Sequence, residues 1–481
     1  MINMSDKINL EDQKIKAAGK YGWPVFVVLL GIIQGGVLWM DHHPMFFFGD
    51  SGSYIWTSIS KSPPTDRSFV YGYFIRLVAL KTQSLTMLVV VQVLMASFIC
   101  VVAAHLLMRY FRVRPWCAFG TVLLFALEPL QLLYARYVMT ETLALFVFVF
   151  YVWVALHYLE DSRIKWLAVL QGLAVLLISV RFAYIPLARI CAIFIPLLSV
   201  PAIYAKAGPG SVKPVLRISA HIVMSVLLLF VFTTSYKHLH GYLQYKKPPA
   251  YSYDDGFFAL TFVVPILEPE DFPYEKLGRQ LLGDPAWPLD RMNRAMHRWA
   301  KDGIVARLRK LVPDRLQANA IARQTAFHAV IHRPHAFLHL GWQTFTDYFD
   351  PSYLRYSMES DLEKRRLEDK FHNLIKTRFR YSSDKSSPFE LKSLTGRYFL
   401  ESARWLQILL FLPLGWLLLS AVTRDPDQRR KILFASLLVL ILFGVAVFLV
   451  ERPMPRFMHI LPWFACLMAG IVLDRILPWR E

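Results

Sequence analysis

Long apolar runs separated by short polar loops dominate the first half and the end of the chain. An α-helix needs about 20 apolar residues to cross a hydrocarbon core roughly 30 Å thick, and about ten of these runs approach that length. The pattern therefore predicts an all-α membrane protein with about ten transmembrane helices. The predicted spans are 23–40, 84–108, 115–133, 138–158, 164–180, 183–204, 215–235, 402–422, 431–450 and 457–477.

Two longer stretches interrupt this pattern and are predicted to lie outside the membrane, on its outer side. Residues 41–83 are partly amphipathic and are expected to lie along the bilayer surface. Residues 236–401 are long enough for a small domain, with apolar and charged residues at helical spacing over 291–310 and 361–376. The predicted organisation is an N-terminal transmembrane bundle (1–235), a mainly helical periplasmic domain (236–401) and C-terminal transmembrane helices (402–481).

Positive charges in the short loops set the predicted orientation. The apolar run 23–40 follows several lysines, as in a signal peptide, but the sequence Asp41-His42-His43-Pro44 is not a small-residue cleavage site. We therefore predict a retained first span with a cytoplasmic N-terminus. All four predicted cytoplasmic loops then contain Lys or Arg, in the stretches 109–114, 160–165, 206–217 and 423–431.

The composition narrows the classes of partner. Of the 481 residues, 55% are hydrophobic and 19% are charged, and the formal net charge is +19. Much of the positive excess lies in loops between spans and in the long polar stretch, which favours lipid phosphates or an anionic substrate over nucleic acid. The cysteines lack disulfide or metal spacing and are interpreted as small buried side chains: Cys100, Cys117, Cys191 and Cys466.

Asp50 is the most informative polar residue in the chain. It follows three phenylalanines a few residues beyond the first span, where a carboxylate is costly and is usually functional when present. Its ordinary alternative is to cap a helix that begins at Ser51. The predicted topology brings further charged residues to the same membrane face, namely Glu141, Arg181, Arg452 and Arg456. Carboxylates and arginines at one face suit a substrate with both a phosphate and a group to be deprotonated.

Each of these residues also has an ordinary structural explanation. Arginines near span ends often anchor at the interface, tyrosines often belong to the aromatic belt, and neighbouring opposite charges often pair. The alternatives are interfacial anchoring for Arg181 and Arg456, an ion pair with Arg136 or a helix N-terminal position for Glu141, an ion pair with Glu451 for Arg452, and a belt position for Tyr54.

Three polar groups raise the question of a metal site. Four histidines fall at helical spacing, but Pro334 interrupts the run and no acidic ligand accompanies it. Adjacent histidines point in different directions, and an Asp-Asp-Gly run is typical of a turn. No cofactor is predicted, and a divalent metal stays an open alternative at His328, His332, His335 and His339, at His42 and His43, or at Asp254 and Asp255.

The order of the polar motifs resembles the GT-C superfamily of polytopic glycosyltransferases, which includes bacterial aminoarabinose transferases and protein O-mannosyltransferases. The resemblance covers most of the membrane part but not residues 236–401. The chain has Gly-Asp where the mannosyltransferases have Asp-Glu, so their substrate class does not carry over. The matching motifs are Gly49-Asp50-Ser51 with Tyr54, Pro129 and Tyr134 with Thr140-Glu141, Arg181, and Arg456-Phe457 with Leu461-Pro462.

The resemblance implies a donor sugar linked to undecaprenyl phosphate or a similar polyprenyl phosphate. The sugar would move to a hydroxyl of a cell-envelope glycan, lipid or protein, at the periplasmic face of the bacterial inner membrane. A departing phosphate is a stable anion that needs no strong general acid, so one base suffices. The expected roles are catalysis for Asp50, as the base, and Glu141, donor-phosphate binding for Arg181, Arg452 and Arg456, and substrate binding for Tyr54.

Two other functions fit the same sequence. A transporter or flippase of lipid-linked sugars would have paired repeats and polar residues at mid-bilayer, whereas here no repeat is found and the polar residues gather at one face. A polysaccharide polymerase or ligase would share the chemistry but take a lipid-diphosphate donor. Turnover of monophosphate and diphosphate carriers would separate these functions.

Overall fold

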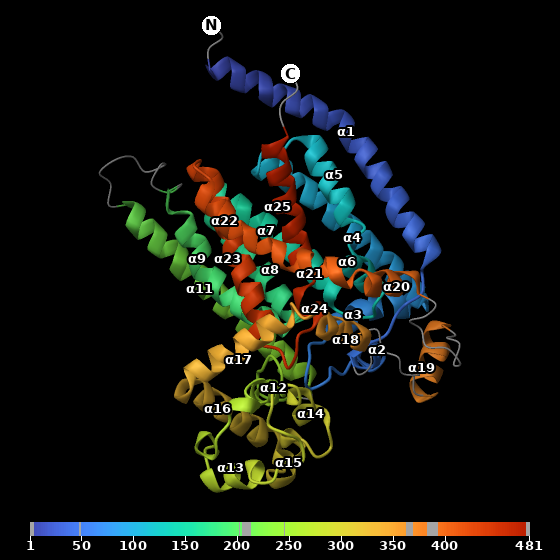
Figure 1. Ribbon diagram of the computed structural model, residues 1–481, viewed down its shortest axis with the longest axis vertical. Coiled ribbons are helices and arrows are strands. Elements are labelled where there is room, and N and C mark those ends of the chain that lie inside the picture. The colour runs from blue at the N-terminus through green and yellow to red at the C-terminus, as the bar shows by residue number, and fades with distance from the viewer. Residues whose placement is uncertain are drawn as a thin grey trace.

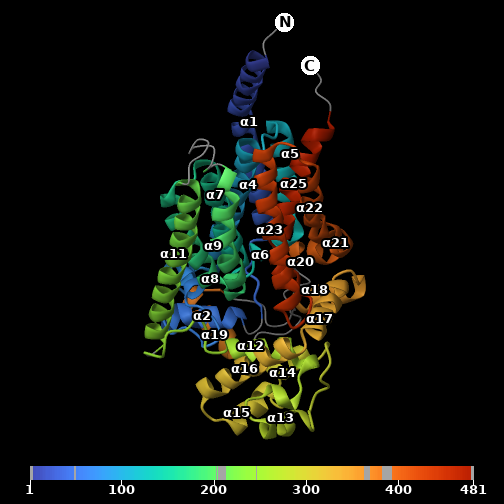
Figure 2. The same ribbon diagram turned by 90° about the vertical axis from the view of Figure 1, so that its left-hand side faces the viewer.

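A computed structural model describes residues 4–47, 50–201, 203, 213–244, 246–361, 369–381 and 393–477, and most of this part of the chain is helical. The structure is 79% helical, and the described residues form no strand beyond one isolated β-bridge between Met45 and Tyr137. The predicted all-α class is confirmed. Figures 1 and 2 show an elongated molecule in which both chain ends lie at one end of a helical bundle and α12 to α17 cap the other.

Six helical stretches are long and apolar enough to cross a membrane. They are Gly22–Met40 of α1 (Met4–Met40), α4 (Leu85–Tyr110), α7 (Glu141–Asp161), Val215–Leu243 of α11 (Lys213–Leu243), Trp405–Val422, and α23 (Pro426–Phe448). Each coincides with a predicted span. The other four predicted spans coincide with shorter helices, which are α5 (Pro115–Phe125), α6 (Pro129–Tyr134), α8 (Ile164–Val180), η2 (Phe182–Tyr184), α9 (Ile185–Leu198), α24 (Pro455–Met458) and α25 (Leu461–Ile476).

Two predicted spans are broken at prolines. The 115–133 span divides between α5 and α6, where the Glu128 carboxylate caps α6 by accepting hydrogen bonds from two backbone N–H groups and Pro129 takes the first helical position. The 402–422 span contains a short 3₁₀ turn around Pro413, because proline lacks the N–H that a continuous helix requires. Its parts are α21 (Ala403–Phe411), η6 (Leu412–Leu414) and α22 (Gly415–Val422).

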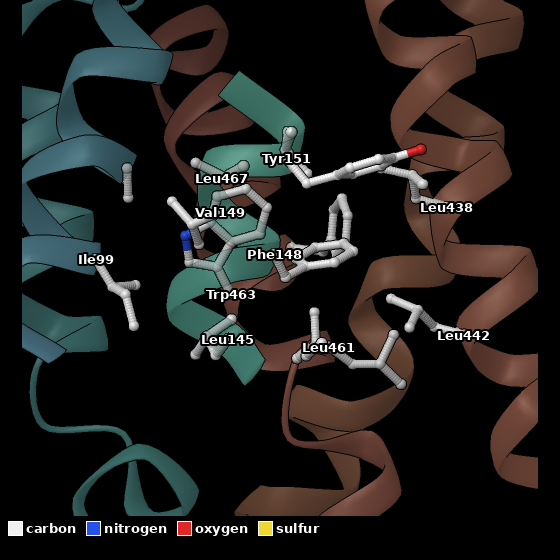
Figure 3. Close-up of a cluster of buried hydrophobic side chains, with 14 of the residues drawn as sticks. Ile99, Leu145, Phe148, Val149, Tyr151, Leu438, Leu442, Leu461, Trp463 and Leu467 are labelled. Atoms are coloured by element: carbon white, nitrogen blue, oxygen red, sulfur yellow. The ribbon is translucent and has the colours of Figure 1, made fainter. Parts of the chain in front are cut away.

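The core of the bundle lies between α4, α7, α23 and α25. Figure 3 shows Phe148 and Trp463 at its centre, with their ring centroids 6.1 Å apart in an edge-to-face arrangement. Both side chains are completely buried. Buried aromatic pairs of this geometry stabilise by about 0.5–1.5 kcal/mol beyond the burial of their apolar area. This contact holds α7, which begins at Glu141, against α25.

The first loop, residues 41–83, forms three short helical elements. It consists of α2 (Asp50–Ser60), α3 (Val70–Ile75) and the π-helical turn η1 (Arg76–Leu80). Tyr71 is buried, and its hydroxyl donates a 2.8 Å hydrogen bond to Gln92 of α4. Gly72 faces Thr57 so closely that a Cβ atom would lie 2.5 Å from the threonine methyl group. The loop is therefore packed onto the bundle, which positions Asp50.

The segment after α11 has a hydrophobic core of its own. The core is built mainly from α12, α15 and α16. Gly256 allows α12 to touch α16, since a Cβ atom there would lie 1.9 Å from the Asn319 carbonyl oxygen. The elements of this segment are α12 (Asp255–Phe262), η3 (Val264–Ile266), η4 (Pro269–Asp271), α13 (Glu275–Leu282), α14 (Arg294–Trp299), α15 (Ile304–Leu311), α16 (Arg315–His332) and α17 (Pro334–Asp347).

Three more helices lead back to the bundle. They are α18 (Pro351–Asp361), α19 (Asp369–Phe379) and α20 (Leu394–Glu401). The Asp41 carboxylate, just after α1, accepts a 2.8 Å hydrogen bond from Ser393 and a 2.7 Å bond from the Thr395 hydroxyl, which anchors the start of α20. Below, the end of the bundle that carries α2 and α24 is called the Asp50 end, and the end that carries both chain termini is called the terminal end (Figure 1).

Candidate functional site

Five charged side chains from distant segments meet at the Asp50 end. Asp50 begins α2, Arg67 lies between α2 and α3, and Glu141 begins α7. Arg181 follows α8, and Arg456 lies in α24. Figures 1 and 2 place α2 and α24 close to the junction between the bundle and the capping helices α12 to α17. We call these five residues the Asp50 cluster.

The Asp50 carboxylate lies between two guanidinium groups. One oxygen is 2.9 Å from Arg67 and the other is 2.9 Å from Arg456. The side chains of Asp50, Arg67 and Arg456 are 23%, 14% and 16% exposed. Burial raises the pKa of the Asp50 carboxyl, but the two guanidinium groups outweigh this effect and hold the pKa below its ordinary value. The described contacts of the carboxylate are with arginines, so Asp50 does not act as the helix cap considered as its alternative.

A second ion pair adjoins the first. Arg181 lies 3.0 Å from Glu141, and the same nitrogen donates a 3.2 Å hydrogen bond to the backbone carbonyl of Arg456. His459 bridges the same two segments, with one ring nitrogen 2.8 Å from the Arg456 carbonyl oxygen and the other 3.0 Å from the Glu141 carbonyl oxygen. The two ion pairs therefore form one connected group. Glu141 pairs with Arg181 and not with Arg136, whose guanidinium donates to backbone carbonyls of Asp41 and Leu132.

The ion pair with Arg181 uses one carboxylate oxygen of Glu141, which is Oε1. Its side chain is 1% exposed, and Oε2 has no hydrogen-bond partner among the residues that the structure describes. A buried carboxylate oxygen without a partner is costly and calls for an explanation, such as a ligand or water that completes it. The oxygen lies on the residue that holds Arg181, so the cluster can accept a further hydrogen bond from a polar ligand.

Aromatic rings flank the guanidinium groups. The carbon at the centre of the Arg456 guanidinium lies 4.7 Å from the Phe47 ring, and that of Arg181 lies 4.9 Å from the Phe457 ring. Arg67 lies 5.3 Å from the ring of Tyr54. These cation–π contacts keep the arginines partly dehydrated and orient their planes. Dehydrated guanidinium groups bind phosphate oxygens more strongly than groups in open water do.

Local backbone features place two of these arginines. Arg181 ends α8 in an extended conformation, with φ −146° and ψ 119°, and this turns its side chain away from the helix axis. Arg456 follows Pro455 at the start of α24, where proline occupies a first-turn position that needs no N–H donor. The chain therefore presents both arginines at helix ends, where side chains can converge from different directions.

Two of the predicted site residues lie at the edge of the cluster or outside it. Tyr54 is buried beside Arg67 and Tyr71, and burial raises the pKa of its hydroxyl to about 12, so the hydroxyl remains protonated at neutral pH. Arg452 lies between α23 and α24, four residues before Arg456. Its predicted alternative partner Glu451 accepts a 3.1 Å hydrogen bond from Thr261.

Sequence reasoning did not single out Arg67 or His459. Arg67 follows Asp66 within the first outer loop, and a cation in that predicted loop was the one signal for it. His459 lies three residues after Arg456 in a turn that only the tertiary structure defines. Neither residue belongs to a periodic pattern, so their contacts with Asp50 and Glu141 required the folded structure.

Most of the histidines and aspartates considered for metal binding have other contacts. Among the described residues, no group of three or more His, Cys, Asp or Glu side chains is placed to hold a metal ion. His332 lies 3.1 Å from the Asp271 carboxylate, and the His42 and His43 rings stack on each other with centroids 4.4 Å apart. Asp254 and Asp255 pair with Arg315 and Arg323, respectively, and α12 starts where a turn was predicted.

The described residues form a helical protein with six stretches long and apolar enough to cross a membrane. A compact cluster of paired carboxylates and arginines lies at one end of its bundle. No family model matches the chain, and a search of curated protein sequences finds no match. The resemblance to the GT-C superfamily therefore rests on the motifs and their placement alone.

Proposed function

We propose that the protein is a glycosyltransferase that moves a sugar from a polyprenyl-phosphate donor to an acceptor hydroxyl. The observation that carries this proposal is the convergence of Asp50, Glu141, Arg181 and Arg456 at one end of the bundle, although Asp50 and Arg456 are 406 residues apart. The cluster combines a carboxylate that can take a proton with guanidinium groups that can bind a phosphate. The proposed transfer uses both.

The chemistry proposed for the cluster balances with these groups alone. The acceptor oxygen attacks the anomeric carbon, and the bond between that carbon and the phosphate oxygen breaks. The electron pair leaves with the polyprenyl phosphate, whose added negative charge the arginines stabilise. The acceptor proton passes to Asp50 and then to water. A positioned base of this kind usually contributes about 10²–10⁴-fold in rate.

The paired state of Asp50 suggests how the donor prepares the base. A carboxylate held between two guanidinium groups is a weak base, because the cations lower its pKa. A donor phosphate offers oxygens that compete for Arg67 and Arg456. When the phosphate takes over these arginines, the Asp50 pKa rises and the carboxylate becomes free to accept a proton. Donor binding and base activation are then one event.

The other residues have supporting roles in the proposal. Glu141 holds Arg181 through their 3.0 Å ion pair, and its unpartnered oxygen can accept a hydrogen bond from a sugar hydroxyl. The Tyr54 hydroxyl, which stays protonated, can donate to the substrate. Arg452, which lies between α23 and α24, remains a proposed ligand of the donor phosphate. No step in this scheme requires a metal.

The cellular setting proposed is the bacterial inner membrane, with the Asp50 end facing the periplasm. The polyprenyl tail would lie in the bilayer, along the helices that are long and apolar enough to span it. The acceptor would be a cell-envelope glycan, lipid or protein that approaches from the side of the capping helices α12 to α17.

Transfer assays test the proposal directly. Purified protein is incubated with a panel of undecaprenyl-phosphate sugars and envelope acceptors, and products are identified by mass spectrometry. We expect transfer by the wild type and a loss of about 10²–10⁴-fold in the Asp50→Asn variant. The matched control is Asp255→Asn, which removes a carboxylate that also pairs with an arginine but lies 48% exposed in α12.

Three outcomes would contradict the proposal. Full transfer by the Asp50→Asn variant would remove Asp50 as the base. Transfer only from diphosphate carriers would instead identify a polymerase or ligase. Movement of intact lipid-linked sugar across vesicles without transfer would identify a flippase.

A further inference from the structure

A second polar site lies at the terminal end of the bundle, far from the Asp50 cluster. Here a surface hollow of about 550 Å³ opens between the start of α8 and the first turns of α11. Both helices pack along each other, and Figure 1 shows their upper ends on the side of the chain termini. The hollow is lined by Arg163, Ile164, Lys165, Arg217, Ala220 and His221.

The charge in this hollow is positive and only partly compensated. Arg163 pairs with Asp161 at 2.9 Å. Lys165 rests 5.1 Å from the ring of Trp166. Neither Lys165 nor Arg217 has a carboxylate partner within the described parts of the chain. Of the three cations, Arg163 alone pairs with a carboxylate among the described residues, so an anion that enters the hollow meets an unbalanced positive field.

The floor of the hollow is a built structure rather than a loose surface. His221 is 4% exposed, and its Nδ1 lies 2.7 Å from the hydroxyl of Tyr158 in α7. Deeper between the same helices, Gln171 of α8 donates a 2.9 Å hydrogen bond to Ser225 of α11. The first contact holds α11 against α7, and the second holds α8 against α11. The second ring nitrogen of His221 has no protein partner among the described residues, so it can bond to an anion in the hollow.

The surroundings of the hollow are apolar and exposed. Leu216 is 74% exposed and Val223 is 64% exposed on α11, and Ile164 at the start of α8 is 44% exposed. Such residues on apolar helices face lipid rather than water. A ligand that combined an anionic head with hydrocarbon chains would place the head among the cations and the chains along these side chains.

We propose that this hollow binds the phosphate headgroup of an anionic phospholipid, with its acyl chains lying along α8 and α11. Basic pockets between membrane helices are suited to such headgroups. A free phosphate would satisfy the charges but would gain nothing from the adjoining apolar surface. The proposal is independent of the glycosyltransferase assignment, because none of its residues belongs to the Asp50 cluster.

The experiment measures lipid binding to the full-length protein. Purified protein is delipidated and titrated with phosphatidylglycerol, phosphatidylethanolamine or inorganic phosphate, and binding is followed by native mass spectrometry and by the melting temperature. We expect selective binding of phosphatidylglycerol. Each Lys or Arg close to an anionic lipid strengthens binding several-fold. The loss of two such cations should therefore lower the apparent affinity by about 10–30-fold. The Lys165→Gln/Arg217→Gln variant tests this loss.

A matched control removes charge from the same end without touching the hollow. Arg424 and Arg429 are exposed at the loop before α23 and its first turn, so Arg424→Gln/Arg429→Gln should leave phosphatidylglycerol binding within about twofold. An equal loss in both double variants would mean that the overall positive charge of this end binds the lipid, and it would overturn the site.

The remaining arms separate the possible ligands and exclude misfolding. Equal binding of phosphatidylethanolamine, or stabilisation by inorganic phosphate alone as large as that by phosphatidylglycerol, would also overturn the proposal. Both double variants should have the same melting temperature as the wild type when only phosphatidylethanolamine is present. If Lys165→Gln/Arg217→Gln has a lower melting temperature than the wild type in phosphatidylethanolamine, the single variant Lys165→Met provides the same test. It removes one charge and keeps the length of the aliphatic chain.

Discussion

The two ends of the bundle use the same residue types in opposite ways. At the Asp50 end, the side chains of Arg67, Arg181 and Arg456 are 11–16% exposed, and each pairs with a carboxylate. At the terminal end, Arg163 is 66% exposed, and neither Lys165 nor Arg217 has a described carboxylate partner. One end is a closed group of paired charges, and the other is an open basic hollow.

The difference follows from the cost of burying charge. A buried cation without a partner is strongly destabilising, so arginines withdrawn from water need carboxylates close by. An exposed cation keeps its hydration and needs none. An anionic ligand must therefore exchange partners to enter the Asp50 cluster, whereas it can enter the hollow without breaking an ion pair other than that of Arg163. The first arrangement suits chemistry that is switched on by substrate, and the second suits steady binding.

The largest effect expected is the loss of the shared carboxylate. In the Asp50→Ala variant, Arg67 and Arg456 would face each other without the anion between them. We expect the free energy of unfolding to fall by about 2–4 kcal/mol, because a partly buried pair is broken and two like charges remain. Thermal and denaturant unfolding in detergent measure this change.

The terminal end provides the contrasting control for that prediction. Lys165→Ala/Arg217→Ala removes exposed cations that have no described carboxylate partner, so stability in neutral lipid should stay within about 0.5 kcal/mol. Equal destabilisation at both ends would show that the ion pairs of the Asp50 cluster contribute nothing special.

Part of this contrast could be predicted from the sequence. The alternation of apolar runs and loops predicted an all-helical chain, and it correctly located the six stretches that are long enough to span a membrane. The order of loops also predicted that Asp50, Glu141, Arg181 and Arg456 would share one face. The breaks at Glu128-Pro129 and at Pro413 were not predicted, because the surrounding residues are apolar and hydropathy hides the missing backbone donor.

The ion-pair partners within the Asp50 cluster could not be predicted from the sequence. Nothing in the spacing of the chain indicates that Arg67 and Arg456 share one carboxylate, since this depends on how α2 and α24 meet. The hollow was missed for a similar reason. Arg163, Lys165 and Arg217 were predicted as cytoplasmic loop charges, and only the packing of α8 against α11 brings them around His221.

The next effect concerns two carboxylates whose pKa values depart from the ordinary ones in opposite directions. Burial raises the pKa of Glu451, and nearby arginines lower it only in part, so it remains above the ordinary value of 4.5. The folded state then binds a proton more tightly than the unfolded state does. Stability should therefore rise as the pH falls through the folded pKa toward 4.5. The rise should be about 1.4 kcal/mol for each tenfold difference in proton affinity between the two states.

Asp50 should show the opposite sign. Its pKa lies below the ordinary value of 3.8, so its contribution to stability is complete above that value and is lost as the pH falls through the folded pKa. Melting curves from pH 8 to pH 3 check both statements. Glu451→Gln should remove part of the rise on the acid side of neutrality, and Asp50→Asn should remove part of the loss below pH 4. A Glu451→Gln curve parallel to that of the wild type would contradict the Glu451 assignment.

Raising the salt concentration should weaken anion binding at the terminal end more than it weakens the ion pairs at the Asp50 end, although this effect is smaller than those above. Raising ionic strength from 0.1 to 1 M shortens the screening length from about 10 Å to about 3 Å, which weakens exposed charges far more than buried ones. We expect phosphatidylglycerol binding at the hollow to weaken several-fold. The stability difference between wild type and Asp50→Ala should change by less than about 0.5 kcal/mol. If high salt removed most of that stability difference, the charges of the Asp50 cluster would be as exposed to solvent as those of the hollow.

The smallest effect expected comes from the aromatic ring between the two arginines of the Asp50 cluster. The Phe457 ring lies 4.9 Å from Arg181 and 5.5 Å from Arg456. Phe457→Leu keeps an apolar side chain but removes the π face, so we expect a loss of about 0.5–1 kcal/mol. Phe457→Tyr keeps the face and should lie within about 0.3 kcal/mol of the wild type. Equal melting of the Leu and Tyr variants would show that the ring only fills space. A lower melting temperature for the Leu variant would show that aromatic contacts, as well as carboxylates, shield these guanidinium groups from water. The cations of the hollow have no such shielding by carboxylates.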